Sequence, residues 1–187
     1  MKVRMIIIAA PSGAGKSSFV ERITKDIPRL RDTVTFTTRP MRVGESEGHP
    51  YHFVSAETFL ELRDRGFFVE WAMVHENMYG TPHPQLEEAW ERDEVIIMDV
   101  DVQGAETFKK KFSDAISIFI LPPSIDELRR RVVKRDQRVP VDLEIRMRNA
   151  EREIQRASEF DFQLVNDDFD KSYQQFKKIV EDLLARR

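Results

Sequence analysis

The first apolar run of the chain leads directly into a turn with two glycines and then into a Lys-Ser pair, so that residues 5–17 read MIIIAAPSGAGKS. This order predicts a buried strand, a loop whose backbone N–H groups point inward around an anion, and a helix whose N-terminus adds partial positive charge. Gly13 and Gly15 allow the loop to curl because they have no Cβ atom. We interpret the segment as a phosphate-binding loop; the alternative is an ordinary strand–turn–helix junction with a solvated Lys16.

The segment matches the phosphate-loop pattern G-x-x-x-x-G-K-[ST] except at its opening position, where the chain has Ala10. An alanine is tolerated at that corner if its φ angle stays negative, and otherwise costs about 1 kcal/mol. In this pattern Lys16 reaches the β- and γ-phosphates of a nucleotide, and the Ser17 hydroxyl binds Mg²⁺. We therefore predict that nucleotide phosphates bind at Pro11, Ser12, Gly13, Ala14, Gly15, Lys16, Ser17 and Ser18.

A second motif, VIIMDVD over residues 95–101, is an apolar run that ends in carboxylates. Such a run is typical of a strand buried on both faces of a parallel sheet. Asp99 at its end suits an aspartate that holds the hydration shell of Mg²⁺ near a phosphate loop. An aspartate in an ordinary turn is the alternative. The phosphate loop favours the metal interpretation, with Ser17 and Asp99 as the metal-site residues.

Apolar runs and helical periodicities alternate along the chain, which predicts a parallel sheet covered by helices on both sides, with the phosphate loop at the carboxyl edge of a strand. Residues 32–54 are polar and rich in proline and glycine, so we expect them to be irregular, and residues 79–82 (YGTP) indicate a turn. Ser124 and Glu127 form a capping-box pattern. Further strands are expected at 67–74, 95–98, 116–121 and 162–165, and helices at about 16–27, 56–65, 84–92, 124–135 and 143–158, before a closing helix with the apolar stripe Tyr173, Phe176, Val180 and Leu183.

Composition places the chain among globular domains and excludes several functions. Its 187 residues, 41% of them hydrophobic, suffice for one domain with a buried core. With 30 basic and 33 acidic residues the net charge is −3, so we expect neither nucleic acid nor a membrane as a partner, and the patterns predict no oligomeric state. The absence of cysteine excludes disulfides and thiolate chemistry and suits a cytoplasmic protein. The N-terminal apolar run is too short for a signal peptide, and no segment has the length of a transmembrane helix.

An arginine-rich segment over residues 37–45 (TTRPMRVGE) is a candidate anion site. Arg39 and Arg42 lie three residues apart with Tyr51 downstream, and two such guanidinium groups suit a phosphate; a solvated loop is the alternative. His49 and His52 lie in a loop without cysteine or helical spacing, which does not favour a zinc site. The four histidines are His49, His52, His75 and His83.

A second cationic segment lies between residues 129 and 138, where six residues are basic and one is acidic. A solvated helix face or a weak nucleic-acid patch is the usual meaning of such a run. Arg131 and Arg135, however, are four residues apart and share one helix face, opposite apolar positions. One directed cationic face favours a phosphate clamp.

Together with further short motifs, these segments make the chain resemble guanylate kinase along nearly its whole length, in the order and at the spacing of that family. The motifs are residues 37–45 with Gly48 and Tyr51, Glu70-Trp71, Tyr79-Gly80-Thr81, residues 99–104 (DVDVQG), Pro122-Pro123 and Val165-Asn166-Asp167. Three positions depart from the family pattern: Ala10, Phe36 in place of a small hydroxylated residue, and Asp136 in place of glycine.

The resemblance implies a parallel-sheet P-loop kinase core with helices on both faces, an inserted acceptor-binding subdomain and a helical lid. The core would cover about 1–32, 82–124 and 150–187, the GMP-binding subdomain about 33–81, and the lid about 125–149. The phosphate of GMP would be bound by Arg39, Arg42, Tyr51 and Tyr79, and guanine by Thr35, Glu70, Thr81 and Asp101. ATP would also contact Asn166, and the catalytic cations would be Lys16, Arg39, Arg131, Arg135 and Arg148.

The implied activity is reversible, Mg²⁺-dependent transfer of the γ-phosphoryl group of ATP to GMP or dGMP, giving ADP and GDP, in purine nucleotide metabolism. A carboxylate at Glu70 would accept from guanine N1–H and the exocyclic amine, whereas adenine offers neither donor there. Two alternatives are left open. A kinase of another small phosphorylated acceptor, such as a sugar phosphate, would give Glu70, Thr81 and Asp101 no purine edge to bind. A noncatalytic guanylate kinase-like scaffold would be expected to lose the loop and lid charges, which this chain keeps.

Overall fold

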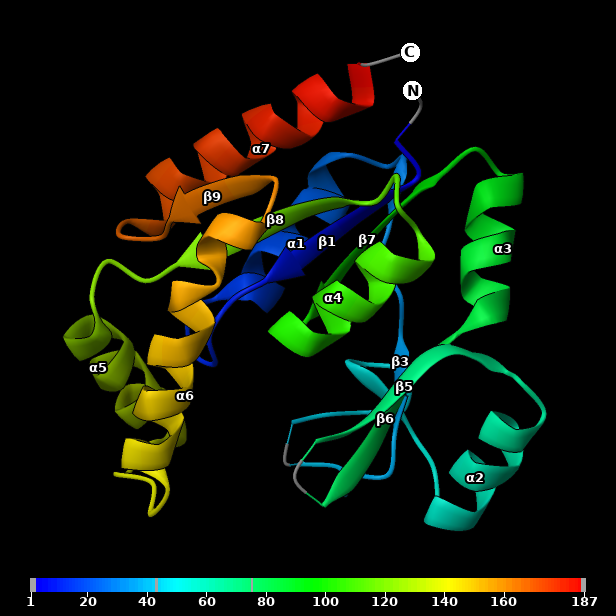
Figure 1. The fold of residues 1–187 in the computed structure, drawn as a ribbon, viewed down its shortest axis with the longest axis horizontal. Helices are drawn as coiled ribbons and strands as arrows, with labels where there is room; N and C mark the ends of the chain where they lie inside the picture. Colours follow the sequence, from blue (N-terminus) through cyan, green and yellow to red (C-terminus); the bar gives the residue numbers. More distant parts are fainter. Residues whose placement is uncertain (1–2, 43, 75, 186–187) are drawn as a thin grey trace.

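The structure, a computed structural model, describes residues 3–42, 44–74 and 76–185. Val43 of the first arginine-rich segment and His75 among the histidines lie outside the described residues. The chain forms a five-stranded and a four-stranded sheet. Figure 1 shows the four-stranded sheet below the larger one and, across from it, an arm made of two helices, α5 (Ile125–Asp136) and α6 (Leu143–Gln155).

The five-stranded sheet has the order β2-β7-β1-β8-β9, and its neighbouring strands run parallel. The central strand β1 (Met5–Ala9) is buried at every position. Its residues alternate between two clusters, since Ile6 and Ile8 pack on one face of the sheet and Ile7 packs on the other. This two-sided burial explains the unbroken apolar run, and the predicted parallel sheet is confirmed. The remaining strands are β2 (Leu30–Arg31), β7 (Val95–Val100), β8 (Ile116–Leu121) and β9 (Phe162–Val165).

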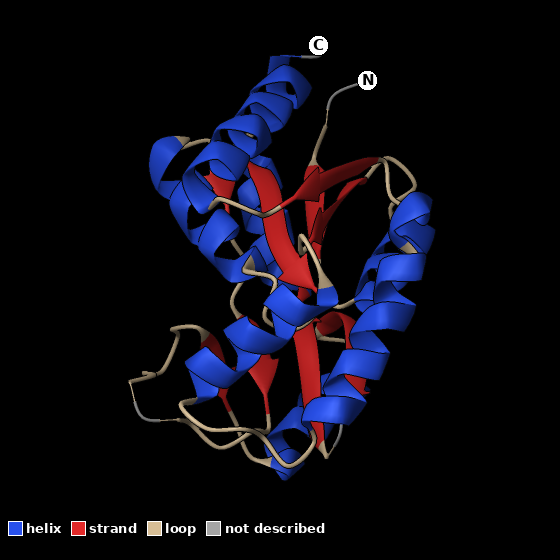
Figure 2. Cartoon of the chain, turned by 90° about the vertical axis from the view of Figure 1, so that its left-hand side faces the viewer, coloured by secondary structure: helices blue, strands red, loops and turns tan. Residues whose placement is uncertain are grey.

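Helices flank the strands on both sides (Figure 2). α1 (Lys16–Asp26) and α7 (Phe169–Ala185) contribute to the cluster on one face, and α3 (His83–Glu91) and α4 (Val102–Lys111) to the cluster on the other. The apolar stripe predicted for the closing helix is buried along α7. No sequence pattern predicted α4, because its buried stripe has only three residues and its last turn is three lysines.

The second sheet has the order β4-β3-β6-β5, with β3 (Thr35–Thr37), β4 (Tyr51–Phe53), β5 (Phe68–Val74) and β6 (Asn77–Pro82). Two expectations were wrong here. Residues 32–54 are not irregular throughout, because they contain β3 and β4, and residues 79–82 form part of β6 rather than a turn. Position 80 of β6 requires glycine, because a Cβ atom there would lie 2.8 Å from the Phe68 ring. The predicted helix at 56–65 is α2 (Ala56–Asp64), which packs Phe59 against Phe68 at a centroid distance of 4.6 Å.

The arm begins as the capping pattern predicts, because Ser124 Oγ accepts a hydrogen bond from the Glu127 N–H at 3.1 Å. The Glu127 carboxylate, however, binds Arg131 instead of returning to the Ser124 backbone. The helix expected to run to residue 158 ends at Gln155, and a short 3₁₀ helix (Ala157–Glu159) follows. In the described part of the chain, no helix is both long and apolar enough to cross a membrane.

Candidate active site

The predicted phosphate loop connects β1 to α1 and turns at its two glycines. Gly13 and Gly15 have φ angles of 93° and 94°, a region that residues with a Cβ atom rarely adopt. The Ala14 N–H donates to the Pro11 carbonyl at 3.0 Å and closes the turn. Ala10 is not among the described residues that combine a side chain with a positive φ angle. The alanine at the opening of the pattern is therefore tolerated without strain.

Two distant segments hold this loop in place. A Cβ atom on Gly13 would lie 2.8 Å from Val132 Cγ2, so the loop backbone packs directly on α5. Asn166, which follows β9 and is 4% exposed, donates from Nδ2 to the Ala14 carbonyl at 2.9 Å. Its Oδ1 is buried and has no hydrogen-bond partner among the described residues. This position is compatible with the ATP contact predicted for Asn166.

The proposed metal residues are in contact. Ser17 Oγ donates to Asp99 Oδ2 at 2.8 Å, because β1 and β7 are parallel neighbours whose carboxyl ends meet at one edge of the sheet. Hydroxyl and carboxylate oxygens are ligands that Mg²⁺ prefers, and Mg²⁺ commonly takes one or two protein ligands and fills its other positions with water and phosphate oxygens. The donor set of Ser17 and Asp99 therefore fits Mg²⁺.

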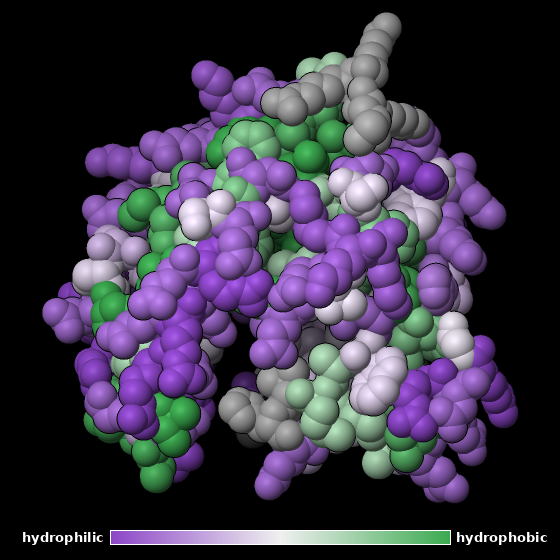
Figure 3. Space-filling view, viewed as in Figure 1, coloured by the Kyte–Doolittle hydropathy of each residue, from purple (hydrophilic) through white to green (hydrophobic). Residues whose placement is uncertain are grey.

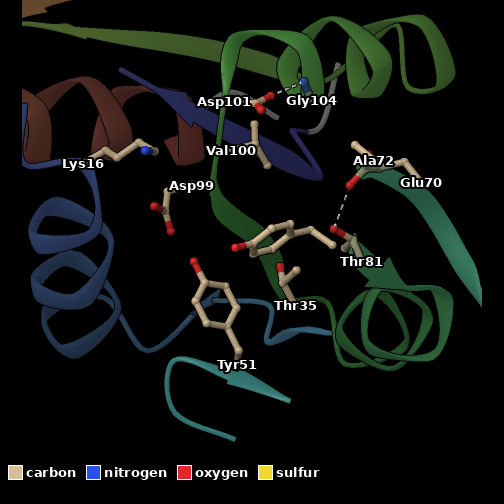
Figure 4. Close-up of a pocket in the computed structure, with 11 residues that line it drawn as sticks. Lys16, Thr35, Tyr51, Glu70, Ala72, Thr81, Asp99, Val100, Asp101 and Gly104 are labelled. Atoms are coloured by element: carbon tan, nitrogen blue, oxygen red, sulfur yellow. Dashed lines mark hydrogen bonds between the residues drawn. The ribbon is translucent and has the colours of Figure 1, made fainter. Parts of the chain in front are cut away.

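A cavity of about 260 Å³ lies between the carboxyl edge of the core sheet and the second sheet (Figure 4). Figure 3 shows the groove that separates the arm from the second sheet in the same view as Figure 1. Both sheets contribute polar groups to the cavity, so the loop lysine and the predicted guanine-binding residues share one space. The lining residues are Lys16, Thr35, Tyr51, Glu70, Ala72, Tyr79, Thr81, Asp99, Val100, Asp101 and Gly104.

Glu70 on β5 lies beside Thr81 of β6, whose Oγ1 donates to Glu70 Oε1 at 3.4 Å (Figure 4). The pKa of Glu70 is raised from 4.5 to about 7, mainly by burial and then by the Asp101 carboxylate; the Thr81 hydroxyl and Lys111 act in the opposite direction. Asp101 is fixed as the cap of α4, because its Oδ1 accepts from the Gly104 N–H at 2.7 Å. The site thus presents two carboxyl groups to a ligand that offers N–H donors.

Arg39 is 9% exposed and makes two side-chain hydrogen bonds within its own segment. It donates to the Pro40 carbonyl at 2.8 Å and to Glu45 Oε1 at 2.7 Å, and its guanidinium carbon lies 5.3 Å from the centroid of the Tyr51 ring. The backbone N–H of Arg42 donates to the other oxygen of Glu45 at 2.7 Å. Glu45 therefore ties together the two arginines predicted to bind one phosphate.

Tyr51 and Tyr79 meet edge to face, with ring centroids 5.9 Å apart. The Tyr51 hydroxyl is directed toward Asp99 (Figure 4), and its pKa is raised, first by burial and then by the Asp99 charge. Nearby, His52 Nδ1 lies 2.7 Å from Glu47 Oε1. Tyr51 therefore contacts Arg39 through its ring and has its hydroxyl directed toward Asp99.

The predicted lid arginines lie apart from this cavity. Arg131 donates from Nε to Glu127 at 2.8 Å and from Nη2 to the Asp167 carbonyl at 3.2 Å. Arg135 donates from Nε to Asp136 Oδ1 at 2.8 Å. None of the predicted lid arginines lines the cavity, so an action on phosphates would require the arm to move.

Arg148 on α6 is exposed. The arginine that shares a carboxylate with Arg135 is Arg146, which donates to Asp136 Oδ2 at 3.1 Å. Arg146 was not among the predicted site residues. It lies four residues after Asp142, which it binds at 2.8 Å, and this helical spacing is the signal in the sequence that points to it.

Two carboxyl groups near the site were also missed. Asp32 follows β2 and is exposed at its surface. Its pKa is raised to about 7, first because the surrounding protein displaces water that would stabilise the charged form, and then by the Asp99 charge. Glu153 on α6 has a pKa raised mainly by burial and lowered in part by the charge of Lys16. No sequence motif identifies either residue, since Asp32 is the first residue of the polar segment 32–54 and Glu153 lies in α6, a helix rich in charged residues.

Comparison with known proteins decides the family. The guanylate kinase family profile matches residues 2–183. The chain belongs to the guanylate kinase family. The guanylate kinase of Bdellovibrio bacteriovorus is 63% identical over 185 residues, which cover 99% of this chain and 100% of the relative. The guanylate kinase of Thermotoga maritima is 37% identical over 100% of this chain and 90% of the relative.

Solved structures agree with this membership in the guanylate kinase family. The crystal structure of guanylate kinase from Anaplasma phagocytophilum has a TM-score of 0.80 and 29% sequence identity, covering 99% of this chain and 87% of that one. A shikimate kinase from Bacteroides thetaiotaomicron, with a TM-score of 0.52 and 11% identity over 95% of this chain and 98% of its own, is similar in fold alone. The predicted P-loop kinase fold is therefore confirmed, whereas the roles of individual residues stay predictions.

Proposed function

We propose that this chain transfers the γ-phosphoryl group of ATP reversibly to GMP, giving ADP and GDP, as part of purine nucleotide metabolism in the cytoplasm. The observation that carries the proposal is the cavity of Figure 4, where Lys16 of the phosphate loop faces the same space as Glu70 and Asp101. A loop for a donor phosphate and two carboxyl groups for a base with N–H donors are the features that such a reaction needs at one place.

The acceptor needs no general base. The phosphate of GMP has a second pKa of about 6, so it is already an oxyanion at neutral pH. The protein's task is to bring two anionic groups into line and to neutralise them. Lys16 supplies charge on the donor side, and Arg39 and Arg42 supply it on the acceptor side. When bound at Ser17 and Asp99, Mg²⁺ would neutralise charge on the donor phosphates.

Guanine recognition would rest on Glu70, with Thr35, Thr81 and Asp101 around it. An ionised Glu70 accepts hydrogen bonds from N1–H and from the exocyclic amine of guanine, whereas adenine would leave this carboxylate unpaired. On the donor side, Asn166, which binds the Ala14 carbonyl of the phosphate loop, would contact ATP.

We further propose that residues 33–81 act as a GMP-binding subdomain and residues 125–149 as a lid, around a core formed by the rest of the chain. The lid arginines Arg131, Arg135 and Arg148 would contact the transferring phosphoryl group only after closure. Closing would also exclude water, which otherwise accepts the phosphoryl group.

The test is a coupled ADP-release assay with GMP, dGMP, AMP, CMP, UMP and a sugar phosphate as acceptors. We expect the kcat/KM for GMP to exceed that for AMP by at least about 10²-fold, and chelation of Mg²⁺ to abolish turnover. A larger kcat/KM for a sugar phosphate would assign the chain to another small-molecule kinase. GMP binding without any turnover would indicate a noncatalytic scaffold.

A further inference from the structure

The turn between α5 and α6 contains a carboxylate that is shared by arginines of both helices. Asp136, the last residue of α5, accepts from Arg135 Nε at Oδ1 (2.8 Å) and from Arg146 Nη1 at Oδ2 (3.1 Å). Arg146 also donates from Nε to Asp142 Oδ2 at 2.8 Å. Two guanidinium groups that lie on different helices are therefore brought together by one side chain.

The setting of Asp136 allows it to act as a counter-ion. Its side chain is 24% exposed, against 51% for Arg135 and 32% for Arg146. The pKa of Asp136 is lowered, first by the hydrogen bond from Arg135, so the carboxylate is ionised at neutral pH. Because two guanidinium groups repel each other, a negative charge between them is what allows them to remain neighbours in the free protein.

The shared carboxylate leaves donors available on both arginines. A guanidinium group has five N–H donors in a planar fork. Arg135 binds Asp136 through Nε, which leaves its two terminal nitrogens for a second anion. Arg146 uses Nε and Nη1, which leaves Nη2. The arrangement orients the arginines without saturating them.

We propose that Asp136 is a positioning residue for phosphoryl transfer, which holds Arg135 and Arg146 as one anion-binding pair before the substrates arrive. The inference rests on the proposed function, because it assigns this pair to the transferring phosphoryl group. Fixing two long side chains in advance removes rotamer entropy that they would otherwise lose during the reaction. Asp136 therefore acts through the arginines and does not itself touch a substrate.

A purely structural link between the two helices is the competing explanation, and the chain contains a matched example. Arg129 on α5 and Glu144 on α6 form a two-point ion pair, with Arg129 Nη2 2.9 Å from Glu144 Oε2. The hydrogen bonds and ion pairs that the structure shows for Asp136, Arg135 and Arg146 include neither Arg129 nor Glu144. Replacing Glu144 therefore removes an ion pair between the same helices and leaves the proposed positioning intact.

The test compares steady-state kinetics of Asp136→Ala, Asp136→Asn, Asp136→Glu and Glu144→Ala in the full chain, with folding checked by thermal unfolding. We expect Asp136→Ala to lower kcat about tenfold with the KM for GMP within about twofold, since the pair acts mainly in the transition state. Asp136→Asn, which keeps the shape and loses the charge, should lose less, and Asp136→Glu should recover most of the rate. Glu144→Ala should keep kcat within about twofold.

Replacing both arginines shows whether Asp136 acts through them, because it binds one with each oxygen. Adding Asp136→Ala to the Arg135→Ala/Arg146→Ala variant should slow that variant by no more than about twofold. A wild-type kcat in Asp136→Ala, or an equal loss in Glu144→Ala, would overturn the inference. Tighter binding of inorganic tripolyphosphate by Asp136→Asn with unchanged kcat would also overturn it, because Asp136 would then be a competitor for the arginines. Failure of the proposed function is distinct, since the wild-type chain would then not release ADP with GMP.

Discussion

The donor side of the cavity is made largely of backbone, whereas the acceptor side is made of side chains. The phosphate loop owes its shape to Gly13 and Gly15, which adopt positive φ angles, and to close packing on Val132 of α5. The acceptor side presents Glu70 and Thr81 from two neighbouring strands of the second sheet. Backbone N–H groups are the same whatever the sequence, so the first arrangement suits phosphate, which all nucleotides share; a particular base requires particular side chains.

The two sides also differ in what they cost the folded state. Backbone dipoles of a loop and helix N-terminus supply positive potential without removing an ionised side chain from water. Glu70 is buried strongly enough that its pKa is raised to about 7, so its charged form is disfavoured until a ligand supplies donors. Selectivity on the acceptor side is therefore coupled to stability and to pH through Glu70, whereas the backbone groups of the phosphate loop do not titrate. The following changes test this difference.

Lys16→Ala should have the largest effect. Lys16 is the charged side chain that the loop adds to its backbone cradle, and we expect its loss to lower kcat by about 10³-fold while the KM for GMP changes far less. Steady-state kinetics with ATP and GMP measure this. Lys25→Ala on the same helix is the matched control, because Lys25 is exposed and pairs with Glu21 at 2.8 Å. A Lys16→Ala protein that kept more than about a tenth of the wild-type kcat would remove the loop from the mechanism.

Glu70→Gln should have the next largest effect, and it should change selectivity as well as rate. The amide keeps the shape, but it offers one acceptor and adds donors, so we expect the kcat/KM for GMP to fall by roughly 10² to 10⁴ and that for AMP to stay level or rise. Measurement of kcat/KM for both nucleotides decides the matter. Glu57→Gln on the exposed first turn of α2 is the control. An unchanged preference for GMP would show that Glu70 does not read the base, although it lines the cavity.

The same contrast explains which parts of the molecule the sequence predicts. The phosphate loop, Ser17 and Asp99 follow from contiguous segments and from the rule that parallel strands end at one edge of a sheet, so local patterns suffice. The second sheet depends on pairing between distant residues. Strands β3 and β4 lie in a segment rich in glycine and proline. Within β6, position 80 is a glycine because the Phe68 ring leaves no room for a Cβ atom. Turn propensity alone cannot reveal such a contact.

The lid shows the same limit at the level of single residues. Arg131 and Arg135 lie in one helix, α5, as predicted, whereas the hydrogen bonds that the structure shows join Arg135 through Asp136 to Arg146 of α6 and not to the predicted Arg148. After Asp136 the chain turns at Gln137, whose φ angle is 55°. Relative rotation of two helices is a tertiary property, so motif spacing does not determine which face meets the other.

The smallest expected effect is the pH dependence that Glu70 gives to recognition of the acceptor base. Because the pKa of Glu70 is about 7 in the free protein, lowering the pH through 7 adds a proton to the carboxyl group and removes an acceptor that guanine requires. The kcat/KM for GMP should therefore fall at low pH. GMP and AMP carry the same phosphate, whose own titration near pH ~6 cancels in their ratio. We expect the ratio of kcat/KM for GMP to that for AMP to fall about tenfold between pH ~7.5 and ~5.5, and to be nearly flat in Glu70→Gln.

Stability supplies an independent measurement of the same group, with the opposite sign. The folded-state pKa of Glu70 lies above its ordinary value of 4.5, so the folded protein binds this proton more tightly than the unfolded chain does. The contribution of Glu70 to the free energy of unfolding should then decrease as pH rises from about 4.5 to about 7, by up to about 3 kcal/mol, and change no further above that. Thermal or urea unfolding should show Glu70→Gln gaining stability relative to wild type across this window. A stability difference independent of pH, together with a flat GMP-to-AMP ratio in the wild type, would mean that Glu70 titrates at its ordinary value and that both sides of the cavity are equally insensitive to pH.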